Sequence, residues 1–211
     1  MGSNKAILAL GDGSVFSGKS IGFLGEANGE IIFNTSMTGY QEILTDPSYA
    51  KQIVTLTYPH IGNTGTNLLD MESDRVWCNG LVIRDLPNAD SNWRKENSLK
   101  DFLVSNRVVG ISDIDTRKLT KLIRKKGAQS AAIIGGEKIN EKMAISLAKR
   151  FSGIENLDLA KEVTTSKQYA WKSKANDTSS FTRKYKVVVL DFGVKRNILK
   201  ILSEKGCDLL V

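Results

Sequence analysis

The chain has 211 residues, with 30 lysine and arginine residues against 23 acidic residues and one histidine, which gives a formal net charge of +7. Apolar residues make up 41% and charged residues 25%, an ordinary globular composition that excludes collagen-like, low-complexity and wholly disordered classes. The longest purely apolar run, Ala6–Leu10, is far shorter than the about 20 residues of a membrane-spanning helix, so no membrane partner is expected. Two cysteines are too few for a disulfide framework, which predicts a reduced, cytoplasmic protein.

The first third of the chain is expected to be mainly β structure. Ala6–Leu10 is a strand candidate that runs into a glycine-rich turn. Ile21–Leu24 and Ile31–Asn34 are predicted to form a hairpin, because Asn28 and Gly29 between them both tolerate positive φ.

A rigid corner is predicted at Asp46-Pro47-Ser48, because proline presets φ and the aspartate can accept a local backbone hydrogen bond. Gln52–Tyr58 follows as a strand rich in β-branched and aromatic residues, and Val76–Ile83 contains another short strand. From the motif alone, Ser48 is a turn-capping hydroxyl; the alternative is a group presented to a polar ligand.

The middle of the chain becomes helical. Leu99–Val104 is a short helix candidate, and a longer helix follows that Asp115 or Thr116 can cap and that Gly127 ends. A buried strand and a second amphipathic helix are then expected at Ala131–Ile134 and Lys138–Arg150.

The longer helix carries the densest positive charge of the chain. No stacking aromatics or groove-entering motif accompany this charge, so a solvated helix face is favoured and no nucleic-acid partner is expected. A phosphate-binding face and an acidic protein partner are the alternatives. The basic residues are Arg117, Lys118, Lys121, Arg124, Lys125 and Lys126.

The C-terminal segment predicts the opening of a doubly wound α/β domain. Lys186–Leu190 is a continuous apolar run, typical of a parallel strand that is buried on both faces. A helix at Asn197–Lys205 and a strand at Asp208–Val211 complete a βαβ unit. One such unit cannot bury both faces of its sheet, so this second domain is expected to be truncated or completed by something else. Ala170–Arg183, which is polar and aperiodic, predicts a linker.

No complete catalytic set is visible in the residues. Asp191-Phe192-Gly193 matches the kinase metal-binding tripeptide, but the other kinase motifs are missing, so a strand-to-helix turn that needs glycine is favoured. Cys78 and Cys207 lack the context of a nucleophile and are predicted to be buried hydrophobes. His60 stands alone, and no spacing suits a metal, so no metal site is expected.

Several segments together resemble the small, glutamine-hydrolysing subunits of carbamoyl-phosphate synthetases. The resemblance runs in order over essentially the whole chain, and its longest stretch is continuous. The segments are Leu10–Gly13 with Phe16 and Gly18, then Glu30–Asn63, Gly110–Arg124 and Leu190–Leu199.

The resemblance implies a mixed α/β architecture in three parts. These are a β-rich α/β N-terminal domain at residues 5–152, a linker at 153–185, and the start of a class I glutamine amidotransferase domain at 186–211. In that family, a Cys–His–Glu triad hydrolyses glutamine, and ammonia travels to a large subunit. The large subunit makes carbamoyl phosphate from bicarbonate and ATP for arginine and pyrimidine synthesis. ATP and magnesium are therefore expected on the large subunit, and no cofactor is expected on this chain.

The sequence departs from the family because it stops at Val211. The triad is expected beyond that residue, Cys207 is not the family nucleophile, and the chain alone is expected to be inactive. Of the family's glutamine-binding positions, only the serine of the Asp-Pro-Ser-Tyr corner maps here, as Ser48. Lys195 is assigned a supporting role only. The alternative function is a non-catalytic module that docks a large ATP-using subunit.

Overall fold

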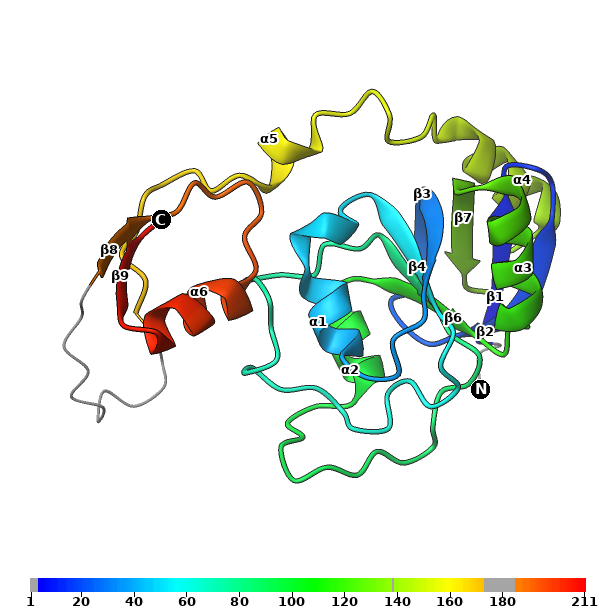
Figure 1. Ribbon diagram of the computed structural model, residues 1–211. Helices are drawn as coiled ribbons and strands as arrows, with labels where there is room; N and C mark the ends of the chain where they lie inside the picture. Colours follow the sequence, from blue (N-terminus) through cyan, green and yellow to red (C-terminus); the bar gives the residue numbers. More distant parts are fainter. Residues whose placement is uncertain (1–3, 138, 173–184) are drawn as a thin grey trace.

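The computed structural model of the protein describes residues 4–137, 139–172 and 185–211. Within these residues, seven strands close into a barrel and two more form a separate parallel sheet, which confirms the mixed α/β class (Figure 1). The barrel strands are β1 (Lys5–Leu10), β2 (Val15–Ser20), β3 (Gly25–Asn34), β4 (Gln52–Leu56), β5 (Gly80–Val82), β6 (Val109–Ser112) and β7 (Gln129–Gly135). The helices that follow or separate them are α1 (Tyr40–Thr45), the 3₁₀ turn η1 (Pro47–Tyr49), α2 (Leu99–Ser105), α3 (Thr116–Lys126), α4 (Glu141–Arg150) and α5 (Leu159–Val163).

The barrel is closed by strands in the order β1-β2-β6-β5-β4-β3-β7. The neighbours from β3 through β4 and β5 to β6 run parallel, and the remaining pairs are antiparallel. Closure leaves no free sheet edge, so every barrel strand has a partner on both sides.

Alternate residues of each strand serve two different cores. In β1, Leu8 belongs to the barrel interior, whereas Ile7 and Ala9 pack outward beneath α4. Helices α1 and α2 cover the outer faces of β4 and β5 in the same way, and α3 adds Leu119 and Ile123 to the interior cluster. Strands β1, β4 and β5 are therefore covered on both faces, which the period-two pattern of side chains permits, whereas the outer face of β2 is exposed at Ser17 and Lys19.

Helix α3 agrees closely with its prediction. Of the two candidate caps, Asp115 is the one used: its Oδ1 accepts a hydrogen bond of 2.9 Å from the Lys118 backbone N–H. The helix ends at Gly127, and its basic side chains are exposed, as expected of a solvated face. Among the described residues, no helix is long and apolar enough to cross a membrane.

The predicted hairpin at Asn28 and Gly29 is wrong. Both residues lie inside β3, which pairs with β7 without interruption from Gly25 to Ile31. Gly29 is needed for a close approach rather than a turn, because a Cβ there would lie 2.5 Å from the Lys51 carbonyl oxygen. Ile21–Leu24, the other half of the predicted hairpin, forms no strand.

The C-terminal unit consists of β8 (Tyr185–Val188), α6 (Arg196–Glu204) and β9 (Cys207–Leu210), with the two strands parallel as expected. The expectation that the first of these strands is buried on both faces is wrong. Val187 packs towards Leu199 of α6, but Val188 is 70% exposed. The reason is that, in the part of the chain described here, only β9 pairs with β8 and only one face of the sheet carries a helix.

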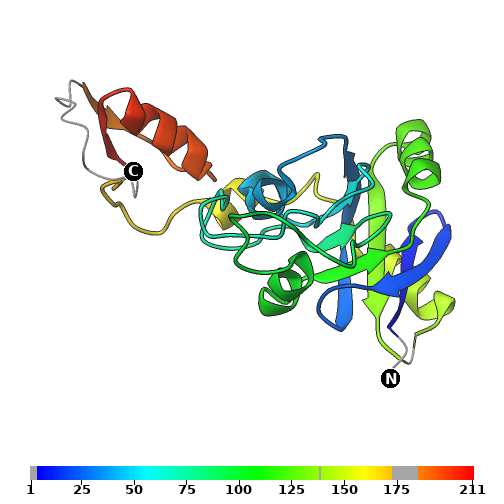
Figure 2. The same cartoon turned by 90° about the horizontal axis from the view of Figure 1, so that it is seen from below.

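The segment between the barrel and this unit is partly attached to both. On α5, Glu162 pairs with Lys51 of the barrel at 3.2 Å, and further on Tyr169 and Trp171 donate backbone hydrogen bonds to β9 and the residue after it. The segment passes over the barrel before it reaches the C-terminal unit, which projects to one side (Figures 1 and 2). Residues 173–184 of the predicted linker, and Lys138 of the predicted second helix, lie outside the described residues.

Candidate functional site

The corner that carries Ser48 forms as the sequence predicts. Helix α1 ends at Thr45, Pro47 begins a 3₁₀ turn, and Asp46 Oδ1 accepts a 2.8 Å hydrogen bond from the Ser48 backbone N–H. Since a carboxylate caps this turn, the backbone at Ser48 is held in one conformation. The side chain is exposed, and its hydroxyl makes no hydrogen bond with any residue that the structure describes.

The turn after β8 packs directly against this corner. Asp191 Oδ1 accepts 2.8 Å hydrogen bonds from the backbone N–H groups of Gly193 and Val194, which fixes a strand-to-helix turn. Gly193 has a φ of +97°, and a Cβ there would lie 3.0 Å from Pro47 Cβ. Glycine is therefore required at this position, both for its backbone conformation and for the close approach of the two segments.

The two residues singled out by the family resemblance meet at one carboxylate. Lys195 Nζ lies 3.4 Å from Asp46 Oδ2, while the other oxygen of the same group holds Ser48. The structure thus brings Ser48 and Lys195 to the same junction, although they come from the barrel and from the C-terminal unit.

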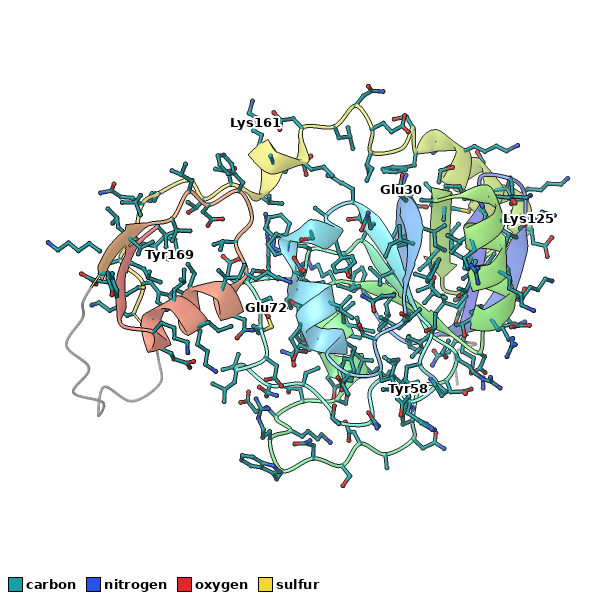
Figure 3. The ribbon with its side chains drawn as sticks, viewed as in Figure 1. Glu30, Tyr58, Glu72, Lys125, Lys161 and Tyr169 are labelled. Atoms are coloured by element: carbon teal, nitrogen blue, oxygen red, sulfur yellow. The ribbon has the colours of Figure 1, made fainter. Side chains whose placement is uncertain are left out.

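Sequence reasoning missed Glu72, which lies between the barrel and α6 (Figure 3). Its carbonyl oxygen accepts a 2.8 Å hydrogen bond from the Arg196 backbone N–H, and its Oε2 accepts one of 2.9 Å from that of Asn197. Helix α6 has no side-chain cap of its own, because Lys195 occupies its N-cap position. Glu72 therefore caps a helix far away in the sequence, in an irregular loop where no local pattern indicates such a role.

A cavity of about 450 Å³ opens at this junction. Its walls combine acidic, cationic and aromatic side chains, and Arg75 stacks over the Trp77 ring at 3.8 Å from the centroid. Burial, followed by the nearby Asp191 charge, raises the pKa of Tyr169, so its phenol stays protonated as a donor. The cavity is lined from the barrel side by Pro47, Glu72, Arg75 and Trp77, and from the other side by Tyr169 and Arg196.

The arrangement is suited to binding a polar ligand rather than to nucleophilic catalysis. Cys78 is buried in the barrel, which raises the pKa of its thiol to about 12, and Cys207 is half-buried on β9. His60 is exposed and packs edge-on against Tyr58 at 5.7 Å between ring centroids. None of these residues lines the cavity, and no group of three potential metal ligands occurs among the described residues.

Comparison with known proteins assigns the family. Residues 8–133 match the family described as carbamoyl-phosphate synthase small chain, CPSase domain, a range that runs from within β1 to within β7 and includes β2 to β6 and α1 to α3. The chain belongs to this family.

Curated relatives extend the match to almost the whole chain. It is 56% identical to the carbamoyl phosphate synthase small chain of Vibrio parahaemolyticus over 99% of this chain and 57% of that protein. It is 55% identical to the small chain of Pseudomonas syringae pv. tomato over 98% of this chain and 57% of the relative. The small chain of Photobacterium profundum is also 55% identical, over 99% of this chain and 56% of its own. The chain thus spans somewhat more than half the length of these relatives.

Proposed function

We propose that this chain forms part of the small subunit of a glutamine-dependent carbamoyl-phosphate synthetase. In this proposal, the complete small subunit hydrolyses glutamine and passes ammonia to a large subunit, which makes carbamoyl phosphate from bicarbonate and ATP. The observation that carries the proposal is the 55–56% identity, over nearly the whole chain, to proteins named carbamoyl phosphate synthase small chain.

The fold suggests which residues of this chain form each domain of the proposed small subunit. The barrel and its helices correspond to the N-terminal domain at residues 5–152, and residues 153–185 connect it to the C-terminal unit. The parallel β8–α6–β9 arrangement is compatible with the opening of a class I glutamine amidotransferase domain, which is doubly wound. We assign the nucleophilic cysteine, histidine and glutamate to the part of the small subunit that this chain does not span.

Ser48 is proposed to contact glutamine from the barrel side. Three features support this: its backbone is fixed by Asp46, its hydroxyl has no partner among the described residues, and its neighbour Pro47 lines the cavity. A hydroxyl can donate to and accept from the polar groups of an amino-acid substrate. Lys195 is proposed to support this corner through Asp46 rather than to contact substrate.

The test is the variant Ser48→Ala, made in a small subunit that is as long as those of the relatives and is assembled with the large subunit. We expect the KM for glutamine to rise about tenfold, the cost of one lost hydrogen bond, while ammonia-dependent synthesis is unchanged. Ser14→Ala is the matched control, because Ser14 also follows an aspartate-capped turn but lies elsewhere on the barrel. Equal loss of the glutamine- and ammonia-dependent rates would remove Ser48 from the glutamine site.

A further inference from the structure

The carboxylate of Asp46 is shared between two parts of the molecule. Oδ1 accepts a hydrogen bond from the Ser48 backbone N–H at 2.8 Å, and Oδ2 faces Lys195 Nζ at 3.4 Å. The Asp46 side chain is only 10% exposed, so its two oxygens are satisfied by these partners more than by solvent. The group therefore links the turn that carries Ser48 to the first residue before α6.

The residues on either side of Asp46 also contact the C-terminal unit, or a residue that binds it. Thr45 Oγ1 accepts a 2.9 Å hydrogen bond from the backbone N–H of Glu72, the residue that caps α6. Pro47 packs against Gly193, and the two residues are so close that a side chain at position 193 would collide with Pro47. Three consecutive residues thus connect α1 and the Ser48 corner to the C-terminal unit, directly or through Glu72.

We propose that Asp46 is a positioning residue, which aims Ser48 at glutamine only when Lys195 and the C-terminal unit are docked on the barrel. Because Lys195 is 44% exposed, its ion pair with Asp46 adds little to overall stability. Its effect is expected on the position of Asp46 and of the Ser48 turn instead. Displacing a substrate-binding group by a fraction of an ångström weakens its contact with the substrate and leaves the reacting groups unchanged. This inference rests on the proposed role of Ser48 in glutamine binding.

The chain contains a matched copy of the same arrangement away from the junction. Asp12 Oδ1 accepts a 2.8 Å hydrogen bond from the Ser14 backbone N–H, and its Oδ2 pairs with Lys126 Nζ at 2.7 Å. Both members of that pair belong to the barrel and its helix α3, so it cannot report the position of the C-terminal unit. Asp12 variants therefore control for the loss of an aspartate-capped turn with a lysine partner.

The experiment measures glutamine- and ammonia-dependent carbamoyl phosphate synthesis in the complete two-subunit enzyme. Asp46→Asn keeps an oxygen for the Ser48 N–H but removes the charge that faces Lys195, and Lys195→Ala removes the other charge. Each is expected to raise the KM for glutamine about tenfold with little change in kcat, and the double variant is expected to do no more than either single one. Lys195→Arg should restore most of the loss, and Asp12→Asn should show none.

The outcomes separate this inference from the proposed function. Two results would overturn the positioning role alone. One is additive effects of Asp46→Asn and Lys195→Ala on the KM for glutamine. The other is normal glutamine use in both of these variants while Ser48→Ala is impaired. Normal glutamine use in Ser48→Ala would overturn the role of Ser48 and this inference together. Ammonia-dependent activity shows that each variant is folded and assembled, and Lys195→Ala, at a half-exposed site, tests the inference even where Asp46→Asn fails to fold.

Discussion

The barrel and the C-terminal unit use similar apolar segments with opposite results. In the barrel, Leu8 and Ile53 are completely buried, and each strand is paired on both sides. In the C-terminal unit, Leu199 and Leu209 are buried, but Val188 of β8 is 70% exposed. The difference shows that burial is set by the partners a strand finds and not by its own hydrophobicity.

This contrast also locates the candidate site. The barrel is closed and supplies a fixed corner at Ser48. Among the residues that the structure describes, only a few groups connect the C-terminal unit to that corner. These are the Asp46–Lys195 pair, the Glu72 cap and the Pro47–Gly193 contact. Elements with few buried apolar contacts open at low free-energy cost, so the junction is expected to be more mobile than the barrel.

The largest expected difference concerns the two cysteines, one in each region. Cys78 is buried in the core between the barrel strands and helices α1 and α2, and burial raises the pKa of its thiol to about 12, while Cys207 is half-buried in the C-terminal unit. Labelling of the native protein with a thiol reagent should modify Cys207 at least about a thousandfold faster, because Cys78 must wait for opening of the barrel. Mass spectrometry of a labelling time course measures both rates. Similar rates would mean that the barrel opens as easily as the C-terminal unit.

Truncation of one apolar side chain in each region, buried in the barrel and exposed in the C-terminal unit, should sharpen the comparison. Leu8→Ala removes a completely buried side chain from the barrel interior and should lower the free energy of unfolding by about 2–5 kcal/mol. Val188→Ala, at a side chain that is 70% exposed, should change it by less than about 0.5 kcal/mol. Urea denaturation followed by circular dichroism checks both values. A large loss for Val188→Ala would show that its exposed face is covered in solution.

The sequence predicts elements well where the signal is local. The cap at Asp115, the 3₁₀ corner at Asp46 and the helix in the C-terminal unit all follow from neighbouring residues. The prediction fails at Asn28, because a turn-forming dipeptide is held in an extended strand by β7, a partner about a hundred residues away.

The same limit applies to the candidate site. The corner that carries Ser48 follows from a local pattern, but the assignment of Ser48 to glutamine binding and the choice of Lys195 come from the family resemblance. The shared carboxylate of Asp46 and the cap from Glu72 depend on how the C-terminal unit packs against the barrel. That packing joins residues from distant parts of the chain, and no spacing in the sequence encodes it.

Helix caps provide a smaller test of the same contrast. Helix α4 is capped by its own Asn140, whose side chain accepts a 2.8 Å hydrogen bond from the Met143 N–H, whereas α6 relies on Glu72. Asn140→Ala should cost about 1 kcal/mol in the unfolding of the barrel. Glu72→Ala should instead lower the hydrogen-exchange protection of the first turn of α6 and leave the barrel amides unchanged. Loss of protection across the barrel in Glu72→Ala would contradict this separation.

The smallest effect expected is the dependence of stability on acid pH at the Asp12 turn. Unlike Asp46, Asp12 has both of its partners, Ser14 and Lys126, within the barrel and its helix α3. Partial burial acts to raise the pKa of Asp12, but the hydrogen bonds from Lys126 and Ser14 outweigh it, and the pKa is lowered. A carboxyl whose pKa is lower in the folded state stabilises the fold above its unfolded pKa, about 3.9, and this contribution is lost as the pH falls through the folded value. Asp12→Asn should therefore be less stable than the wild type at pH 6, and the gap should close as the pH falls below about 4 and through the lowered pKa of Asp12. Urea midpoints measured across that range test the sign; a gap that widens on acidification would mean that the pKa of Asp12 is raised in the folded protein.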